Sequence, residues 1–194
     1  MKYVNLTLAF FHPEDDDHWI NRLVARVSRY PYCHVELYFE TVNECFSIQR
    51  GETAHMRVKN LSSPCYEIVT LNVTEDEYNK CLHFCRAVSS ENIDFDKSGM
   101  YWSYFNIMCC GVNSRLKHKT FCSKIVCEAM QAGGIEEVLY YQASNMTPSR
   151  LYQRVKNSKR RVCASVPYKC MQLVNKKQIV CFQNKMYYRL YNEN

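Results

Sequence analysis

Residues 120–134 constrain the fold of this chain more than any other segment does. In this stretch, TFCSKIVCEAMQAGG, an aromatic residue precedes Cys122, an amphipathic run follows it, and two glycines end the run. The pattern predicts a helix that begins at the cysteine and ends at a glycine cap. Because the first turn of a helix carries partial positive charge and unpaired N–H groups, it favours a thiolate. Cys122 is therefore a candidate nucleophile.

A second segment supplies a candidate base. Residues 33–39, CHVELYF, have the composition of a strand, and His34 stands near its start. A thiolate nucleophile needs a base within hydrogen-bonding reach, and a third polar group then holds the imidazole in the useful tautomer. Ser47 and Gln49 share one face of the next expected strand, and Glu36 shares the face of His34. The spacing leaves all three open as the orienting group.

An inert cysteine is the competing interpretation. The chain has 12 cysteines, and cysteine is among the residue types that are most often buried in protein cores. Cys81, His83 and Cys85 follow one another on an expected helix, where they cannot share one face, so they predict no zinc site. We expect no metal and no cofactor, because phosphate-loop, dinucleotide-binding and zinc-protease motifs are missing.

Strand-like and helix-like segments are arranged along the chain in a way typical of an α+β domain. Apolar alternation bounded by turn residues predicts strands, and apolar residues at helical spacing predict helices. The expected strands are residues 3–11, 34–40, 45–49, 54–58 and 66–73, and the expected helices are residues 18–29, 75–88, 122–132 and 148–155. Residues 99–108 are aromatic and predict a helix or a lid. We expect one domain over residues 1–194, in which residues 156–194 add a basic segment and short strands.

The charge pattern bears on partners. The formal net charge of +6 is mild, so it permits an acidic partner without requiring one. A basic patch after the last expected helix could contact an anionic surface; it comprises Lys156, Lys159, Arg160 and Arg161. A solvated face explains such a cluster more simply, so we expect no nucleic-acid partner.

The sequence also predicts a location. The first residues lack the apolar length and cleavage site of a secretory signal, and no apolar run has the length of a membrane span. The cysteines occur in a chain too long and too rich in core residues to be a disulfide-stapled miniprotein. We expect mostly free thiols and a reducing, cytoplasmic compartment.

Three blocks of the chain occur in an order that one family shares. They are residues 30–37 (YPYCHVEL), residues 45–51 (CFSIQRG) followed by 56–58, and residues 121–134 (FCSKIVCEAMQAGG). In this order they resemble the circularly permuted branch of the NlpC-type papain-like superfamily. That branch includes the YiiX-type hydrolases, lecithin retinol acyltransferase and a small poxvirus protein. The resemblance covers about residues 3–155.

The resemblance implies a papain-like fold in which the cysteine helix packs on a mainly antiparallel sheet that carries the histidine. It implies that Cys122 is the nucleophile and His34 the base, and it places the third residue at Ser47 or Gln49. The implied activity is that of a cysteine hydrolase (peptidase, amidase or thioesterase-like) or an acyltransferase, acting on a peptide or acyl substrate through an acyl-enzyme. The Asn-Cys-Glu-His-Phe hallmark of lecithin retinol acyltransferase is missing, so that activity is not implied.

The family also suggests a setting. A viral or intracellular accessory protein, in a virus-infected host cell, fits the cysteine-rich and tyrosine-rich composition. The alternative function is a catalytically silent papain-like module that binds a host protein or lipid.

Overall fold

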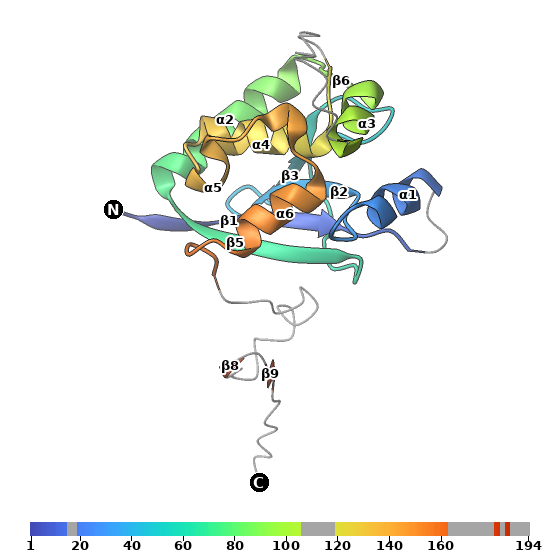
Figure 1. Ribbon diagram of the computed structural model, residues 1–194. Coiled ribbons are helices and arrows are strands. Elements are labelled where there is room, and N and C mark those ends of the chain that lie inside the picture. Colours follow the sequence, from blue (N-terminus) through green and yellow to red (C-terminus); the bar gives the residue numbers. More distant parts are fainter. Residues whose placement is uncertain (15–18, 106–118, 163–180, 183–184, 187–194) are drawn as a thin grey trace.

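The computed structural model of the chain describes residues 1–14, 19–105, 119–162, 181–182 and 185–186 (Figure 1). One antiparallel sheet with the strand order β4-β3-β2-β1-β5 forms its centre. The strands of this sheet are β1 (Tyr3–Phe11), β2 (His34–Phe39), β3 (Glu44–Ser47), β4 (His55–Arg57) and β5 (Tyr66–Thr74). The helices are α1 (Trp19–Val27), α2 (Glu75–Ser90), α3 (Lys97–Phe105), α4 (Cys122–Ala132), α5 (Glu136–Leu139) and α6 (Pro148–Lys156), with the 3₁₀ turn η1 (Ala143–Asn145). The expected α+β class and antiparallel sheet are confirmed.

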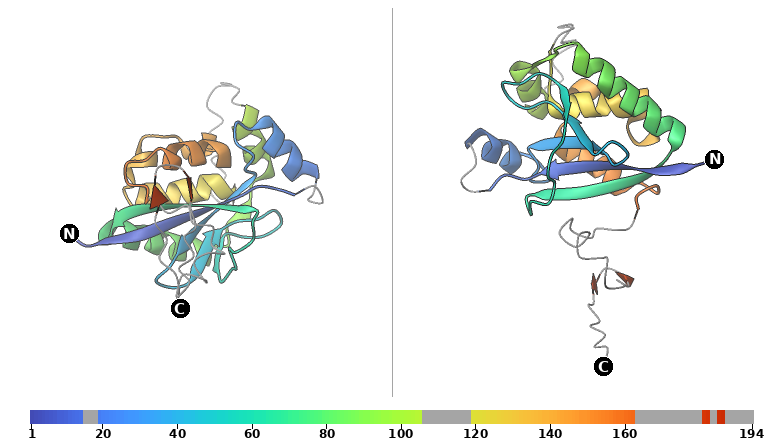
Figure 2. Two further views of the ribbon diagram at one scale, coloured as in Figure 1. Left: turned by 90° about the horizontal axis from the view of Figure 1, so that it is seen from below. Right: turned by 180° about the vertical axis from the view of Figure 1, so that it is seen from behind.

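The helices α2, α4 and α6 lie over one face of the sheet (Figures 1 and 2). The strands alternate between two faces, so Leu8 of β1 pairs with Leu37 of β2 on one side and Val69 of β5 on the other, and all three are buried in the main core. The helices contribute the rest of that core, among them Val126 and Leu151. Sheet and helices therefore enclose one continuous apolar layer.

The opposite face of the sheet is covered differently. A smaller buried cluster forms there from Ala9, Tyr38, Cys45 and Leu61. Leu61 comes from the connection between β4 and β5, which folds back across this face. Because the sheet alternates, Glu36 and His34 share this face with Tyr38 rather than the face under the helices.

The start and end of the central helices follow the sequence signals. Thr74 and Glu77 form a reciprocal capping box at the start of α2, as the Thr-Glu-Asp-Glu run predicts. At the end of α4, Gly134 has φ +78°, and Ile135 N–H donates to the Met130 carbonyl at 2.9 Å. This is a glycine-terminated Schellman cap, and it confirms that the glycine pair ends the helix.

The segment between α2 and α3 contains a strand that is not among those expected from the sequence, β6 (Asp94–Phe95). It pairs in parallel with β7 (Lys119–Thr120), and the Asp96 N–H donates to the Thr120 carbonyl at 2.6 Å. A two-residue strand carries too few residues to show a period of two, so its sequence gives no signal. The pairing fixes the residues that lead directly into Cys122.

The chain after α6 is described only in part. Residues 160–162 run along the edge of β5, where the Val162 N–H donates to the Thr70 carbonyl at 2.9 Å and the Asn72 N–H to the Arg160 carbonyl at 2.8 Å. Farther on, β8 (Cys181–Phe182) pairs antiparallel with β9 (Lys185–Met186). Most of the short strands expected in residues 163–194 lie outside the described residues.

Candidate active site

A cleft of about 520 Å³ lies where the start of α4 meets the start of β2. Both Cys122 and His34 line it, although they are 88 residues apart in sequence (122 − 34). Cys122 is only 3% exposed and the His34 side chain 14%, so both sit at the cleft floor rather than on its rim. The two residues singled out from the sequence are therefore brought together.

His34 lies between a thiol and a carboxylate. Its Nε2 is 3.1 Å from Oε1 of Glu36, and its ring also makes a side-chain hydrogen bond with Cys122. Contacts on both sides of the imidazole hold the plane of the ring.

Of the three orienting candidates, Glu36 is the one whose side chain contacts His34. Its side chain is fully buried, and Oε1 also forms ion pairs with Lys59 and, at 3.5 Å, with Arg57. Burial alone would raise the pKa of Glu36, but His34 and Lys59 outweigh it and lower the pKa to about 2. A carboxylate that stays charged at every working pH can stabilise an imidazolium.

The same neighbours act on the base. Burial lowers the pKa of His34, but the adjacent Cys122 sulfur and the Glu36 carboxylate outweigh this and raise the pKa to about 9. His34 therefore carries a proton at neutral pH, beside the sulfur of Cys122. A protonated imidazole beside a sulfur can stabilise a thiolate.

The two other candidates for orienting His34 do not contact it. Ser47 is buried and its Oγ donates to the Val35 carbonyl at 2.8 Å, so it ties β3 to β2. Gln49 follows β3 and lines the cleft beside His34, where it faces the space for a substrate. Neither of the two residues that the family resemblance favours, Ser47 and Gln49, therefore bonds to His34. The hydrogen bond to His34 comes from Glu36, which shares its face of β2.

The backbone around Cys122 holds the thiol in place. Phe121 is the N-cap of α4, in extended conformation at φ −136° and without a side-chain cap. The next residue, Ser123, is buried and donates its Oγ to the Met146 carbonyl at 2.6 Å. The first N–H groups of α4 have no helical carbonyl to accept them, so they are donors beside the sulfur.

Lys59 and Arg57 are site residues that the sequence did not reveal. Both reach Glu36 from β4 and the connection after it, and Lys59 also lines the cleft. Lys59 lies 5.2 Å from the ring centroid of Tyr66, which adds a cation–π contact. The sequence spacing of Lys59, which lies in a connection, carries no signal that it contacts Glu36 of β2.

The aromatic segment expected as a helix or lid forms α3, and Met100 and Tyr101 contribute to the cleft wall. Phe95 of β6 and Phe11 at the end of β1 complete this apolar side. The part of that segment after residue 105 lies outside the described residues. An apolar wall next to a thiol can hold an acyl chain or an apolar side chain.

Three other buried cysteines have raised pKa values. Burial raises the pKa of Cys45, Cys81 and Cys127 to about 12, with added repulsion from Glu36, Glu77 and Glu128 respectively. These thiols stay protonated and unreactive at neutral pH. The cysteines whose pairing the structure describes form no disulfide.

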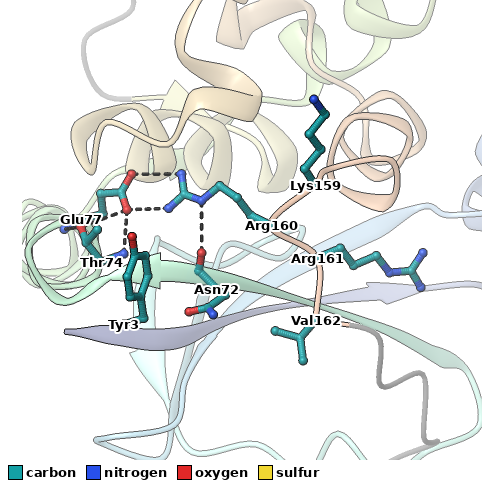
Figure 3. Close-up of a pocket in the computed structure, with 8 residues that line it drawn as sticks. All are labelled: Tyr3, Asn72, Thr74, Glu77, Lys159, Arg160, Arg161 and Val162. Atoms are coloured by element: carbon teal, nitrogen blue, oxygen red, sulfur yellow. Dashed lines mark hydrogen bonds and ion pairs between the residues drawn. The ribbon is translucent and has the colours of Figure 1, made fainter. Parts of the chain in front are cut away.

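The basic patch after α6 is partly used inside the molecule (Figure 3). Arg160 pairs with both carboxylate oxygens of Glu77 and donates from Nε to the Asn72 carbonyl at 3.1 Å. Lys156 lies over the ring of Tyr30 at 4.6 Å. Contact with an anionic surface through this patch stays a prediction that depends mainly on Lys159 and Arg161.

Among the described residues, no group of three His, Cys, Asp or Glu side chains could hold a metal ion. No helix among them is both long and apolar enough to cross a bilayer. Comparison of the chain with protein-family models, curated proteins and solved structures gives no match.

Proposed function

We propose that this protein is a cysteine-dependent hydrolase or acyltransferase with a papain-like site, acting on an amide or (thio)ester bond. One observation carries the proposal: His34 lies between Cys122 and Glu36 on the floor of a cleft with room for a substrate. Nucleophile, base and orienting carboxylate are the three parts that acyl transfer by a thiol needs.

The chemistry follows from the order of these groups. In the resting site the Cys122 proton is held by His34, and the thiolate sulfur attacks the substrate carbonyl carbon. The Cys122 N–H, at the start of α4, donates to the oxygen on which negative charge develops. His34 then passes the proton to the leaving nitrogen, oxygen or sulfur, the bond from carbon to that atom breaks, and a thioester to Cys122 remains.

The second half reverses these roles. A water molecule or an acceptor hydroxyl or amine gives a proton to His34 and attacks the thioester carbonyl. The new bond to carbon forms, the sulfur leaves as a thiolate, and the acyl group departs as an acid, ester or amide. Glu36 keeps its charge throughout and stabilises the imidazolium whenever His34 is protonated.

An acyl-enzyme assay tests this function. With p-nitrophenyl butyrate, we expect a burst of p-nitrophenol and a butyryl group on Cys122, located by peptide mass spectrometry. Cys122→Ser should abolish the burst, and His34→Ala should slow it about 10²-fold or more, since this is the usual contribution of a positioned base. His83→Ala is the matched control, because His83 is exposed on α2 and lies outside the cleft lining.

The contrary result is equally clear. If butyryl groups appear on several cysteines without preference for Cys122, the enzymatic proposal is wrong. The alternative, a silent module that binds a host protein or lipid in this cleft, would then be the function to pursue.

A further inference from the structure

The cleft beside Cys122 has an uneven charge. Besides His34, three cationic side chains line it, Arg50, Lys59 and Lys97, and among the described residues no Asp or Glu does. Lys59 forms an ion pair with the buried Glu36. Apart from His34 beside Cys122, the charge that faces the cleft space therefore comes from Arg50 and Lys97.

The nearby carboxylates are occupied elsewhere. Glu52, two residues after Arg50, accepts from Arg57 Nη1 at 2.9 Å. Asp96, directly before Lys97, is 4% exposed and accepts the Gly99 N–H at 2.8 Å. Within the described residues, Arg50 and Lys97 thus form no ion pair, and both are exposed.

Arg50 and Lys97 each lie at a well-defined turn of the backbone. Arg50 lies in the tight turn closed by the Glu52 N–H and the Gln49 carbonyl at 3.1 Å, and Gly51 takes φ +88° there. Lys97 begins α3, whose first turn is fixed by Asp96. The turn after β3 and the start of α3 are distant in sequence, yet both contribute to the one cleft that holds Cys122.

The apolar part of the lining indicates that the ligand also has an apolar portion. Phe11, Ile48, Phe95 and Met100 supply a surface with no charge, next to these two cations. Burying an apolar chain on such a wall and an anion against unpaired cations satisfies both parts of an amphiphilic anion. A neutral or cationic substrate would leave the two charges without a partner.

We propose that Arg50 and Lys97 recognise a phosphate or carboxylate group on the acyl donor, so that the substrates of this site are acyl compounds that carry an anionic group. The inference rests on the proposed function, because it assigns the substrate class of the same site. Phosphate and carboxylate both present anionic oxygens that can accept hydrogen bonds from the two cations, and the experiment distinguishes the two groups.

The test is protection of the cleft thiols. Cys33 and Cys122 both line the cleft, so iodoacetamide labelling of each, followed by mass spectrometry, reports occupancy. The probes are octyl phosphate, N-octanoyl glutamate and the neutral octyl glucoside. We expect at least one anionic probe to protect about tenfold better than octyl glucoside, since a charge-assisted contact contributes about that factor in affinity.

Paired variants locate the effect. In the double variant Arg50→Gln/Lys97→Gln, the anionic probe should protect the cleft thiols no better than octyl glucoside does. Each labelling rate is taken relative to the rate of the same variant without probe. Lys80→Gln with Arg86→Gln removes the same charge from the exposed face of α2 and should keep the advantage. Circular dichroism confirms that each double variant is folded.

Two results overturn the inference: equal protection by octyl glucoside and the anions, or an advantage that persists in the cleft variant. Neither depends on the reactivity of Cys122, since Cys33 reports the same space. A Cys122 that labels no faster than Cys33 without probe would instead contradict the proposed function. A difference between the phosphate and carboxylate probes identifies the preferred anion.

Discussion

Nε2 of His34 lies 3.1 Å from Oε1 of Glu36, two residues farther along the same strand. Two residues is the shortest separation in sequence at which two side chains of a strand lie on the same face of the sheet. The carboxylate is fully buried while the imidazole reaches the cleft, so the pair connects the interior of the sheet with the thiol of Cys122.

Replacing Glu36 with Gln should weaken the fold as well as the site. The change leaves Lys59 and Arg57 without their shared buried partner, and losing one side of a buried ion pair typically costs about 3 kcal/mol. Urea unfolding measures this. The control is Glu52→Gln, a partly exposed partner of Arg57, for which we expect less than about 1 kcal/mol. Equal effects of the two changes would contradict the central place given to Glu36.

The contribution of Glu36 to the free energy of unfolding should depend on pH. Its pKa is lowered to about 2 in the folded protein, below the usual value of 4.5, so the folded state binds this proton less readily than the unfolded chain. Its contribution is therefore present above pH 4.5 and lost as the pH falls through about 2. The difference in unfolding free energy between wild type and Glu36→Gln should be constant from pH 7 to 5 and shrink below 4.5. A difference that stays constant down to pH 3 would be inconsistent with a lowered pKa.

Acyl transfer should fail in alkali. His34 must hold a proton to donate it to the leaving group, and its pKa is raised to about 9. The rate of acylation by an amide substrate or by a poor leaving group should fall as the pH rises through about 9. The p-nitrophenyl ester needs no such proton for its leaving group, so its rate should not fall there. The same decline for both substrates would exclude this role for His34.

A packing prediction concerns the contact between α2 and α4. A Cβ at Gly133 would lie 2.3 Å from the Cys81 Sγ and 2.8 Å from the Glu77 carbonyl oxygen. Gly133→Ala should therefore cost about 2 kcal/mol by overpacking. Adding Cys81→Ala should recover part of this, since it removes the nearer atom.

Gly134→Ala is the control for that change. Its φ is +78°, but nothing lies within 4 Å of the added Cβ, so only backbone strain of about 1 kcal/mol applies. Chemical denaturation of the three variants measures both effects. A Gly133→Ala protein as stable as wild type would show that the two helices are farther apart than described here.

Local signals in the sequence predicted much of the frame of this site. The capping box at Thr74, the glycine pair after Ala132 and the start of a helix at Cys122 are all local patterns, and each element begins or ends within a few residues of its expected position. The pairing of His34 with Cys122 was expected from the kinds of residue involved, and the structure brings the two side chains together.

The rest depended on contacts between segments distant in sequence. Glu36, Ser47 and Gln49 could not be separated as orienting groups, because alternation gives the face of a side chain but not its partner. Lys59 lies in the same connection as Leu61, which is buried on this face of the sheet, and Arg50 and Lys97 line one cleft although 47 residues separate them in sequence (97 − 50). Such tertiary contacts leave no periodic trace in the sequence.

The most direct test of the central claim is the pH dependence of iodoacetamide labelling at Cys122 in wild type and His34→Ala. We predict that Cys122 labels faster than Cys33 at pH 6 to 7, well below the ordinary thiol pKa of about 8.5, because His34 holds the proton beside the sulfur. In His34→Ala this advantage should be lost and labelling should rise only in alkali. If Cys122 labels no faster than Cys33 in the wild-type protein, or equally fast without His34, the catalytic account is wrong.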